Sequence, residues 1–81
     1  MLPTYEQYKH KVDTMVSLDE LTVEQAIILL ACFKGTLTST PLHINYLMQI
    51  TGLSWKNINY LLNGLVMRKA IRKIEQKYYI V

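Results

Sequence analysis

The fold is decided by the stretch Leu47-Met48-Gln49-Ile50-Thr51-Gly52-Leu53-Ser54. Gly52 accepts the left-handed backbone conformation that a tight turn between two helices requires. Leu53 is positioned to fill the gap between those helices, and Ser54 is a favoured N-cap for the second one. The residues that keep one face of the second helix apolar are Trp55, Ile58, Leu62 and Leu65. The stretch therefore predicts a short helix, a glycine turn and a longer helix.

The spacing of apolar residues predicts four helices and one hairpin along the chain. The helices are expected over residues 3–16, 22–34, 41–50 and 55–68. Two β-branched and aromatic runs, 71–74 and 78–81, predict the strands of a hairpin whose turn is 75–77. The sequence contains no repeat and no linker, so we expect one domain.

Several helix ends carry recognisable capping residues. Thr22 and Gln25 have the spacing of a capping box, which predicts the start of the second helix. Gly35 is the expected C-terminal stop of that helix. Thr40 is expected to cap the third helix, with Pro41 at its first helical position.

From Leu47 to the C-terminus the sequence resembles the winged helix-turn-helix family, including regulators of the MarR and ArsR kind. The resemblance rests on the turn 51–54, the spaced aliphatic residues after it and the aromatic strand 78–81. It implies a mainly α fold with a small β-hairpin, in which residues 21–81 form a three-helix core plus wing. Residues 1–20 then form an additional N-terminal helix and its connector. One departure is Lys69, which stands where the family often has glycine before the wing.

The resemblance implies that the N-terminal part of the helix beginning at residue 55 enters the major groove of double-stranded DNA. The expected contacts from this helix and its cap are Ser54, Lys56, Asn57, Tyr60 and Asn63. The wing is expected beside the DNA backbone, where its contacts are Lys73, Gln76 and Lys77. Thr40 precedes an expected helix N-terminus, which favours a phosphate contact there. Asparagine pairs with adenine, and lysine reaches guanine or a phosphate.

The charge distribution agrees with a polyanionic partner. Residues 52–81 hold six of the nine basic side chains and one of the six acidic ones, a net charge of +5. Residues 1–51 have a net charge of −2. A basic end on an otherwise acidic chain is typical of nucleic-acid binders. We therefore expect a DNA-binding regulator of transcription or a mobile-element protein.

An alternative function is protein binding. The expected outer face of the helix 55–68 holds a single positive charge, and Tyr60 and Met67 supply apolar surface there. Tyrosine and methionine are enriched at protein interfaces. The alternative is a non-enzymatic accessory subunit of a replication complex that contains a polymerase, primase or helicase.

The N-terminal helix provides a third surface. Tyr5 and Tyr8 are expected to pack on the domain, and family members often dimerise through such flanking helices. We therefore also expect a homodimer through residues 3–16, with Tyr5 and Tyr8 at the interface.

The sequence offers no constellation for catalysis, a metal or a cofactor. His10, His43 and Cys32 lie on different segments, and no glycine-rich phosphate loop is present. No stretch reaches the roughly 18–20 apolar residues of a membrane span, and no signal peptide is evident. With its single cysteine, the chain is expected to be a cytoplasmic protein without enzymatic activity.

Overall fold

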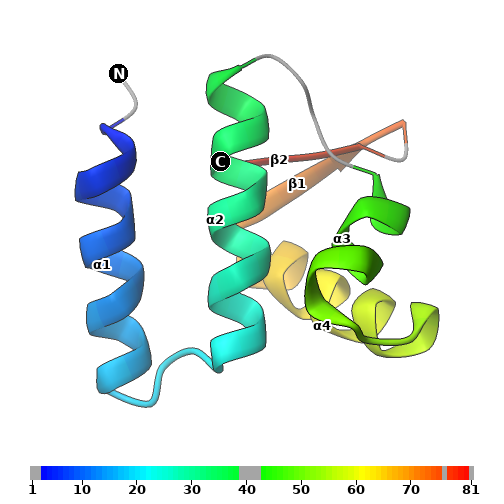
Figure 1. The fold of residues 1–81 in the computed structure, drawn as a ribbon, viewed down its shortest axis with the longest axis horizontal. Helices are drawn as coiled ribbons and strands as arrows, with labels where there is room; N and C mark the ends of the chain where they lie inside the picture. The colour runs from blue at the N-terminus through cyan, green and yellow to red at the C-terminus, as the bar shows by residue number, and fades with distance from the viewer. Residues whose placement is uncertain (1–2, 39–42, 76, 81) are drawn as a thin grey trace.

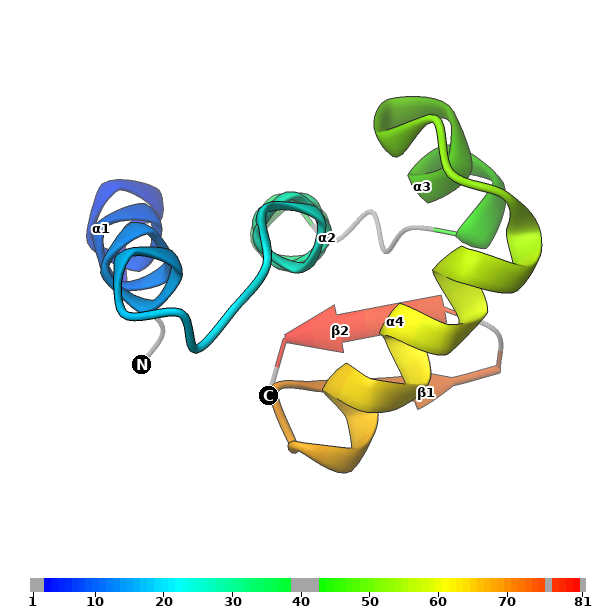
Figure 2. The same ribbon diagram turned by 90° about the horizontal axis from the view of Figure 1, so that it is seen from below.

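The structure is a computed structural model that describes residues 3–38, 43–75 and 77–80. These residues form a mainly helical fold with a small antiparallel hairpin, as the sequence predicts. The elements are α1 (Tyr5–Ser17), α2 (Val23–Leu37), α3 (Ile44–Thr51), α4 (Trp55–Met67), β1 (Ile71–Ile74) and β2 (Lys77–Ile80). Helix α2 lies between α1 on one side and the pair α3 and α4 on the other (Figures 1 and 2).

Side-chain caps fix the starts of three helices. The Thr22 hydroxyl accepts from the Gln25 N–H at 3.1 Å, and the Gln25 side chain accepts from the Thr22 N–H at 3.0 Å. The same reciprocal pair joins Thr4 and Gln7 before α1, which begins at Tyr5. The predicted capping box of α2 and the predicted cap of α4 at Ser54 are confirmed.

The predicted end of α2 at Gly35 is wrong. The helix continues to Leu37, and Gly35 is buried inside it. Two threonine hydroxyls accompany this last turn: Thr36 donates to the Cys32 carbonyl and Thr38 to the Lys34 carbonyl, both at 2.9 Å. Gly35 keeps a helical backbone here, because glycine lowers the stability of a helix interior without forcing the helix to end.

The predicted start of α3 is also wrong, whereas the turn after α3 is confirmed. Helix α3 begins at Ile44, and its N-cap His43 is extended and makes no side-chain cap. A proline fixes its own φ but does not force the following residues into a helix. Thr40 and Pro41 lie outside the described residues. Gly52 has φ 71°, and its N–H donates to the Met48 carbonyl at 2.9 Å, which turns the chain into α4.

One apolar core joins all the helices and the hairpin. Side chains from α2, α3 and α4 occupy its centre, and the predicted inner residues of α4 at 58, 62 and 65 are fully buried. Helix α1 contributes Val12, and its Tyr8 ring stacks on the Phe33 ring of α2 at 4.4 Å between centroids. The hairpin contributes Ile71, Tyr78 and Ile80.

Two features hold the hairpin against the helices. After α4, Lys69 has φ 61°, and the Ala70 N–H donates back to the Leu65 carbonyl at 3.0 Å. This left-handed position, which glycine adopts most readily, is therefore occupied by lysine here. At the other end of the hairpin, the Ile80 N–H donates to the Thr36 hydroxyl of α2 at 3.1 Å.

The strands pair with Ile74 opposite Lys77, so Lys77 belongs to β2 and not to the predicted turn. Glu75, directly after β1, has φ 49°. Because the register follows from the number of turn residues, this difference decides which face each hairpin side chain occupies.

Candidate functional site

The outer face of α4 carries most of the predicted contacts. Ser54 sets the start of the helix, because its hydroxyl accepts from the Asn57 N–H at 3.3 Å. With the start fixed, the 3.6-residue period directs one set of side chains away from the core. The exposed side chains on this face are Lys56, Asn57, Tyr60, Asn63 and Met67. The structure therefore brings these five predicted residues together on one solvent-facing strip.

This strip combines polar and large apolar side chains. Lys56, Asn57 and Asn63 supply one ammonium and two amide groups. Tyr60 is 79% exposed and Met67 is 83% exposed, the highest values among the large hydrophobic side chains of the described residues. Such exposure leaves both side chains free to contact another molecule.

Trp55 does not occupy the core-facing position that its place on the helix predicts. Its side chain is 60% exposed. Trp55 is the first residue of α4, at the end of the helix where the core-facing side is least covered. What lies beside it is a cavity that it shares with Ile44 of α3 and Lys73 of β1.

The predicted hairpin contacts do not form one basic surface. Lys73 pairs with the buried Tyr78, on the inner face of the hairpin. Its Nζ lies 5.9 Å from the centroid of the Tyr78 ring. Lys77 is one residue before Tyr78 and so points to the opposite face. Gln76 and Thr40, the other two predicted backbone contacts, lie outside the described residues.

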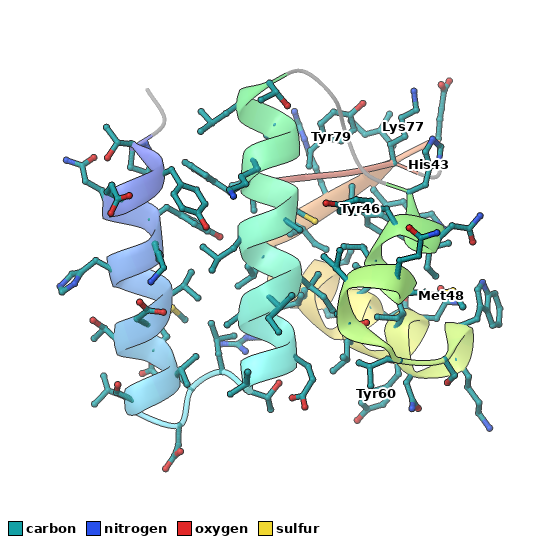
Figure 3. The ribbon with its side chains drawn as sticks, viewed as in Figure 1. His43, Tyr46, Met48, Tyr60, Lys77 and Tyr79 are labelled. Carbon is teal, nitrogen blue, oxygen red and sulfur yellow. The ribbon has the colours of Figure 1, made fainter. Side chains whose placement is uncertain are left out.

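The hairpin and the strip on α4 are separated in space. Tyr60 and Lys77 lie at opposite ends of the view in Figure 3. A partner that contacts both regions must therefore extend across this side of the molecule.

The tyrosines of α1 face inward. Tyr8 stacks on Phe33, and the centroid of the Tyr5 ring lies 6.3 Å from that of Phe33. Lys34 of α2 places its Nζ 4.8 Å from the Tyr5 centroid. The two side chains are thus half-buried within the chain. A homodimer that uses them stays a prediction.

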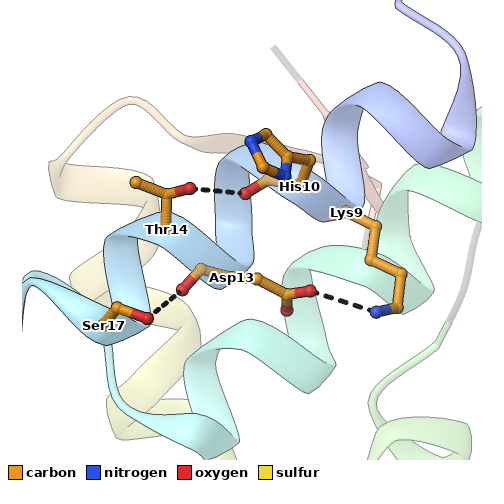
Figure 4. A network of polar contacts seen from close by, with 5 residues as sticks. All are labelled: Lys9, His10, Asp13, Thr14 and Ser17. Carbon is orange, nitrogen blue, oxygen red and sulfur yellow. Dashed lines mark hydrogen bonds and ion pairs between the residues drawn. The ribbon is translucent and has the colours of Figure 1, made fainter.

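The opposite face of α1 is polar (Figure 4). Lys9 pairs with Asp13 at 3.0 Å, and the Thr14 hydroxyl donates to the His10 carbonyl at 2.9 Å. The Ser17 hydroxyl donates to the Asp13 carbonyl at 3.1 Å. A dimer formed through this face would rest on exposed polar contacts, which contribute little each.

Cys32 lies in the core of the molecule. Burial raises the pKa of its thiol to about 12, so the thiol stays protonated and is a poor nucleophile at neutral pH. Within residues 3–38, 43–75 and 77–80, no three His, Cys, Asp or Glu side chains are grouped so that they could hold a metal ion. Nor does this part of the chain contain a helix long and apolar enough to span a membrane.

Asn59 is the residue whose environment the sequence does not reveal. It follows Trp55 by one turn and lines the same cavity, and its Nδ2 is buried without a hydrogen-bond partner among the described residues. Helical periodicity places it only at the edge of the outer face, because its surroundings depend on how the hairpin packs.

Comparisons with models of protein families, with curated proteins and with solved structures find no match for this chain. Its function is therefore inferred from its own residues.

Proposed function

We propose that this chain is a small winged helix-turn-helix DNA-binding protein that acts as a transcriptional regulator or as part of a mobile element. In this proposal α2, α3 and α4 are the three-helix core, and the hairpin of β1 and β2 is the wing. The observation that carries it is the exposed strip on α4, where Lys56 and Asn57 lie in the first turn after the Gly52 turn and Asn63 lies further along the same face. Lysine and asparagine are side chains that pair with base edges in the major groove.

Affinity for DNA and specificity for its sequence come from different parts of this surface. Affinity comes from phosphates neutralised by the basic residues of 52–81, which have a net charge of +5. Sequence specificity comes from Asn57, Asn63 and Lys56. Lys77 adds a backbone contact from the outer face of the hairpin, which acts alike on all sequences.

The test is binding of a fluorescently labelled duplex, measured by anisotropy at several salt concentrations. We expect affinity to fall steeply as salt rises. Lys56→Gln and Lys77→Gln should each weaken binding and each reduce the salt slope by about one. Lys9→Gln is the matched control, because it removes the same charge from α1, away from the strip. Absence of binding to any duplex at low salt would rule the proposal out.

A second candidate is a protein-binding accessory subunit of a replication complex. The exposure of Tyr60 and Met67 favours it, because large side chains of these types serve as contacts in protein interfaces. The partner in this case is a polymerase, primase or helicase subunit, and the complex has a fixed stoichiometry.

The two candidates are separated by variants at opposite ends of the strip. Met67→Asp should abolish a protein complex, because it places a charge in an apolar contact. The same change lies at the C-terminal end of α4, so it should leave the contacts of Lys56 at the N-terminal end intact. Size-exclusion chromatography with each purified partner, alongside duplex titration, gives both readouts. Loss of duplex binding in Lys56→Gln together with an unchanged complex would assign the strip to both roles.

A further inference from the structure

A small cavity lies between the start of α4 and the hairpin. Its lining residues are Ile44, Trp55, Asn59, Lys73 and Tyr78, from α3, α4, β1 and β2, and its volume is about 250 Å³. Pockets for drug-sized ligands measure about 300–1,000 Å³, so this cavity suits a smaller group, such as a single ring system.

Asn59, one of the lining residues, has a buried amide group that lacks a partner. Asn59 Nδ2 is buried and has no hydrogen-bond acceptor among the described residues. A buried donor that is left unpaired lowers stability, and a bound acceptor would recover that loss. The terminal torsion of asparagine is soft, so the amide can turn toward an atom that enters the cavity.

The other lining residues restrict which kind of molecule could supply that hydrogen-bond acceptor. Lys73 supplies a positive charge, and none of the described lining residues is acidic. Trp55 lines the cavity and is 60% exposed, so its indole is accessible to another molecule. An occupant that matches all three groups has hydrogen-bond acceptors, a flat ring and a neighbouring negative charge.

We propose that this cavity binds one unstacked base of a single-stranded nucleic acid. The base stacks on Trp55 and accepts a hydrogen bond from Asn59, and an adjacent phosphate pairs with Lys73. The acidic side chain of a protein would satisfy Asn59 and Lys73 but would leave the indole uncovered, so the base fits better. This inference rests on the proposed nucleic-acid binding and adds a single-strand site on the hairpin side of α4, distinct from the strip of Lys56, Asn57, Tyr60, Asn63 and Met67.

Trp55 is the only tryptophan of the chain, so its fluorescence reports directly on this cavity. The experiment titrates the full chain with a single-stranded oligonucleotide of mixed sequence, while anisotropy of the labelled strand gives the affinity. We expect quenching of Trp55 by the single strand. An otherwise identical strand with abasic sites should bind about tenfold more weakly, because stacking contributes about 1–3 kcal/mol per base. An acidic peptide should give no quenching.

Variants locate the contact. Asn59→Leu and Lys73→Gln should each reduce single-strand affinity several-fold, whereas Lys9→Gln should not. Asn59→Leu removes the unpaired donor and should raise the melting temperature, so its weaker binding would not reflect unfolding.

The outcomes separate this inference from the proposed function. Equal quenching by the abasic strand, quenching by the peptide alone, or unchanged affinity in both cavity variants would overturn the base site. Duplex binding could persist in each of those cases, and the proposed function would then stand. A chain that binds neither duplex nor single strand would contradict both.

Discussion

Cys32 shows how one buried group links stability to pH. Burial raises the folded-state pKa of its thiol to about 12, from the ordinary value of 9.0. Between these two values the unfolded chain loses the thiol proton and the folded chain keeps it. The contribution of this thiol to the free energy of unfolding is therefore fully present below pH 9. It is lost as pH rises toward 12, at up to about 1.4 kcal/mol per pH unit.

The measurement is urea unfolding of the native chain and of Cys32→Ala between pH 8 and 11. The variant lacks the thiol, so its free energy of unfolding should fall less steeply above pH 9. The difference between the two curves removes the contributions of tyrosine and lysine titration. Parallel curves would show that the thiol is not buried in solution.

Lys69 occupies a left-handed conformation that favours glycine. Its φ of 61° follows the last turn of α4, and the Ala70 N–H bond to Leu65 fixes that geometry. Lys69→Gly should therefore stabilise the chain by about 1 kcal/mol, which raises the melting temperature by about 4–8 °C. Lys69→Ala removes the same charge but keeps a Cβ, so it should give no such gain. A lower melting temperature for Lys69→Gly would contradict the assigned backbone conformation.

Among the elements, α4 was the most predictable and the hairpin the least. Ser54 and Gly52 are local signals, and they define the start of α4 without help from the rest of the chain. The periodicity of α4 then gives its buried and exposed faces, and the strip follows. The opposed orientation of Lys73 and Lys77 could not be predicted in this way. It depends on whether Lys77 belongs to the turn or to β2, which the tip sequence Glu75-Gln76 does not specify.

The exposure of Trp55 was missed for a related reason. Periodicity gives the direction of a side chain but not the extent of the core that faces it. At the first turn of α4, that extent depends on Ile44 and the hairpin, which approach from distant parts of the sequence.

Thr36 links two elements, and its loss should loosen the hairpin. Its hydroxyl accepts from the Ile80 N–H and donates to the Cys32 carbonyl. Thr36→Val keeps the size of the side chain but leaves the Ile80 N–H unpaired, at a cost of about 1–3 kcal/mol. Hydrogen exchange at the Ile80 amide should accelerate in this variant. Thr36→Ser keeps the hydroxyl and should preserve the protection of the Ile80 amide. Equal exchange of this amide in the native chain and in both variants would show that the Thr36 hydroxyl does not hold the hairpin.

At the scale of the whole molecule, α1 shares the core of the other elements. Val12 is buried in the same cluster as Leu47 and Leu65, and Tyr8 covers Phe33. We therefore expect α1 and residues 21–81 to unfold in one transition, although the sequence suggests a separate N-terminal segment.

Native-state hydrogen exchange tests this expectation directly. The most protected amides of α1 and α4 should exchange with the same free energy, because both require global unfolding. Tyr8→Ala should lower that shared value by about 2 kcal/mol, since it removes a half-buried ring and its stacking on Phe33. Thr14→Ala, on the exposed face of α1, is the control and should lower neither value. If Tyr8→Ala lowered protection only in α1, then α1 would be an appendage and residues 21–81 would fold as a unit without it.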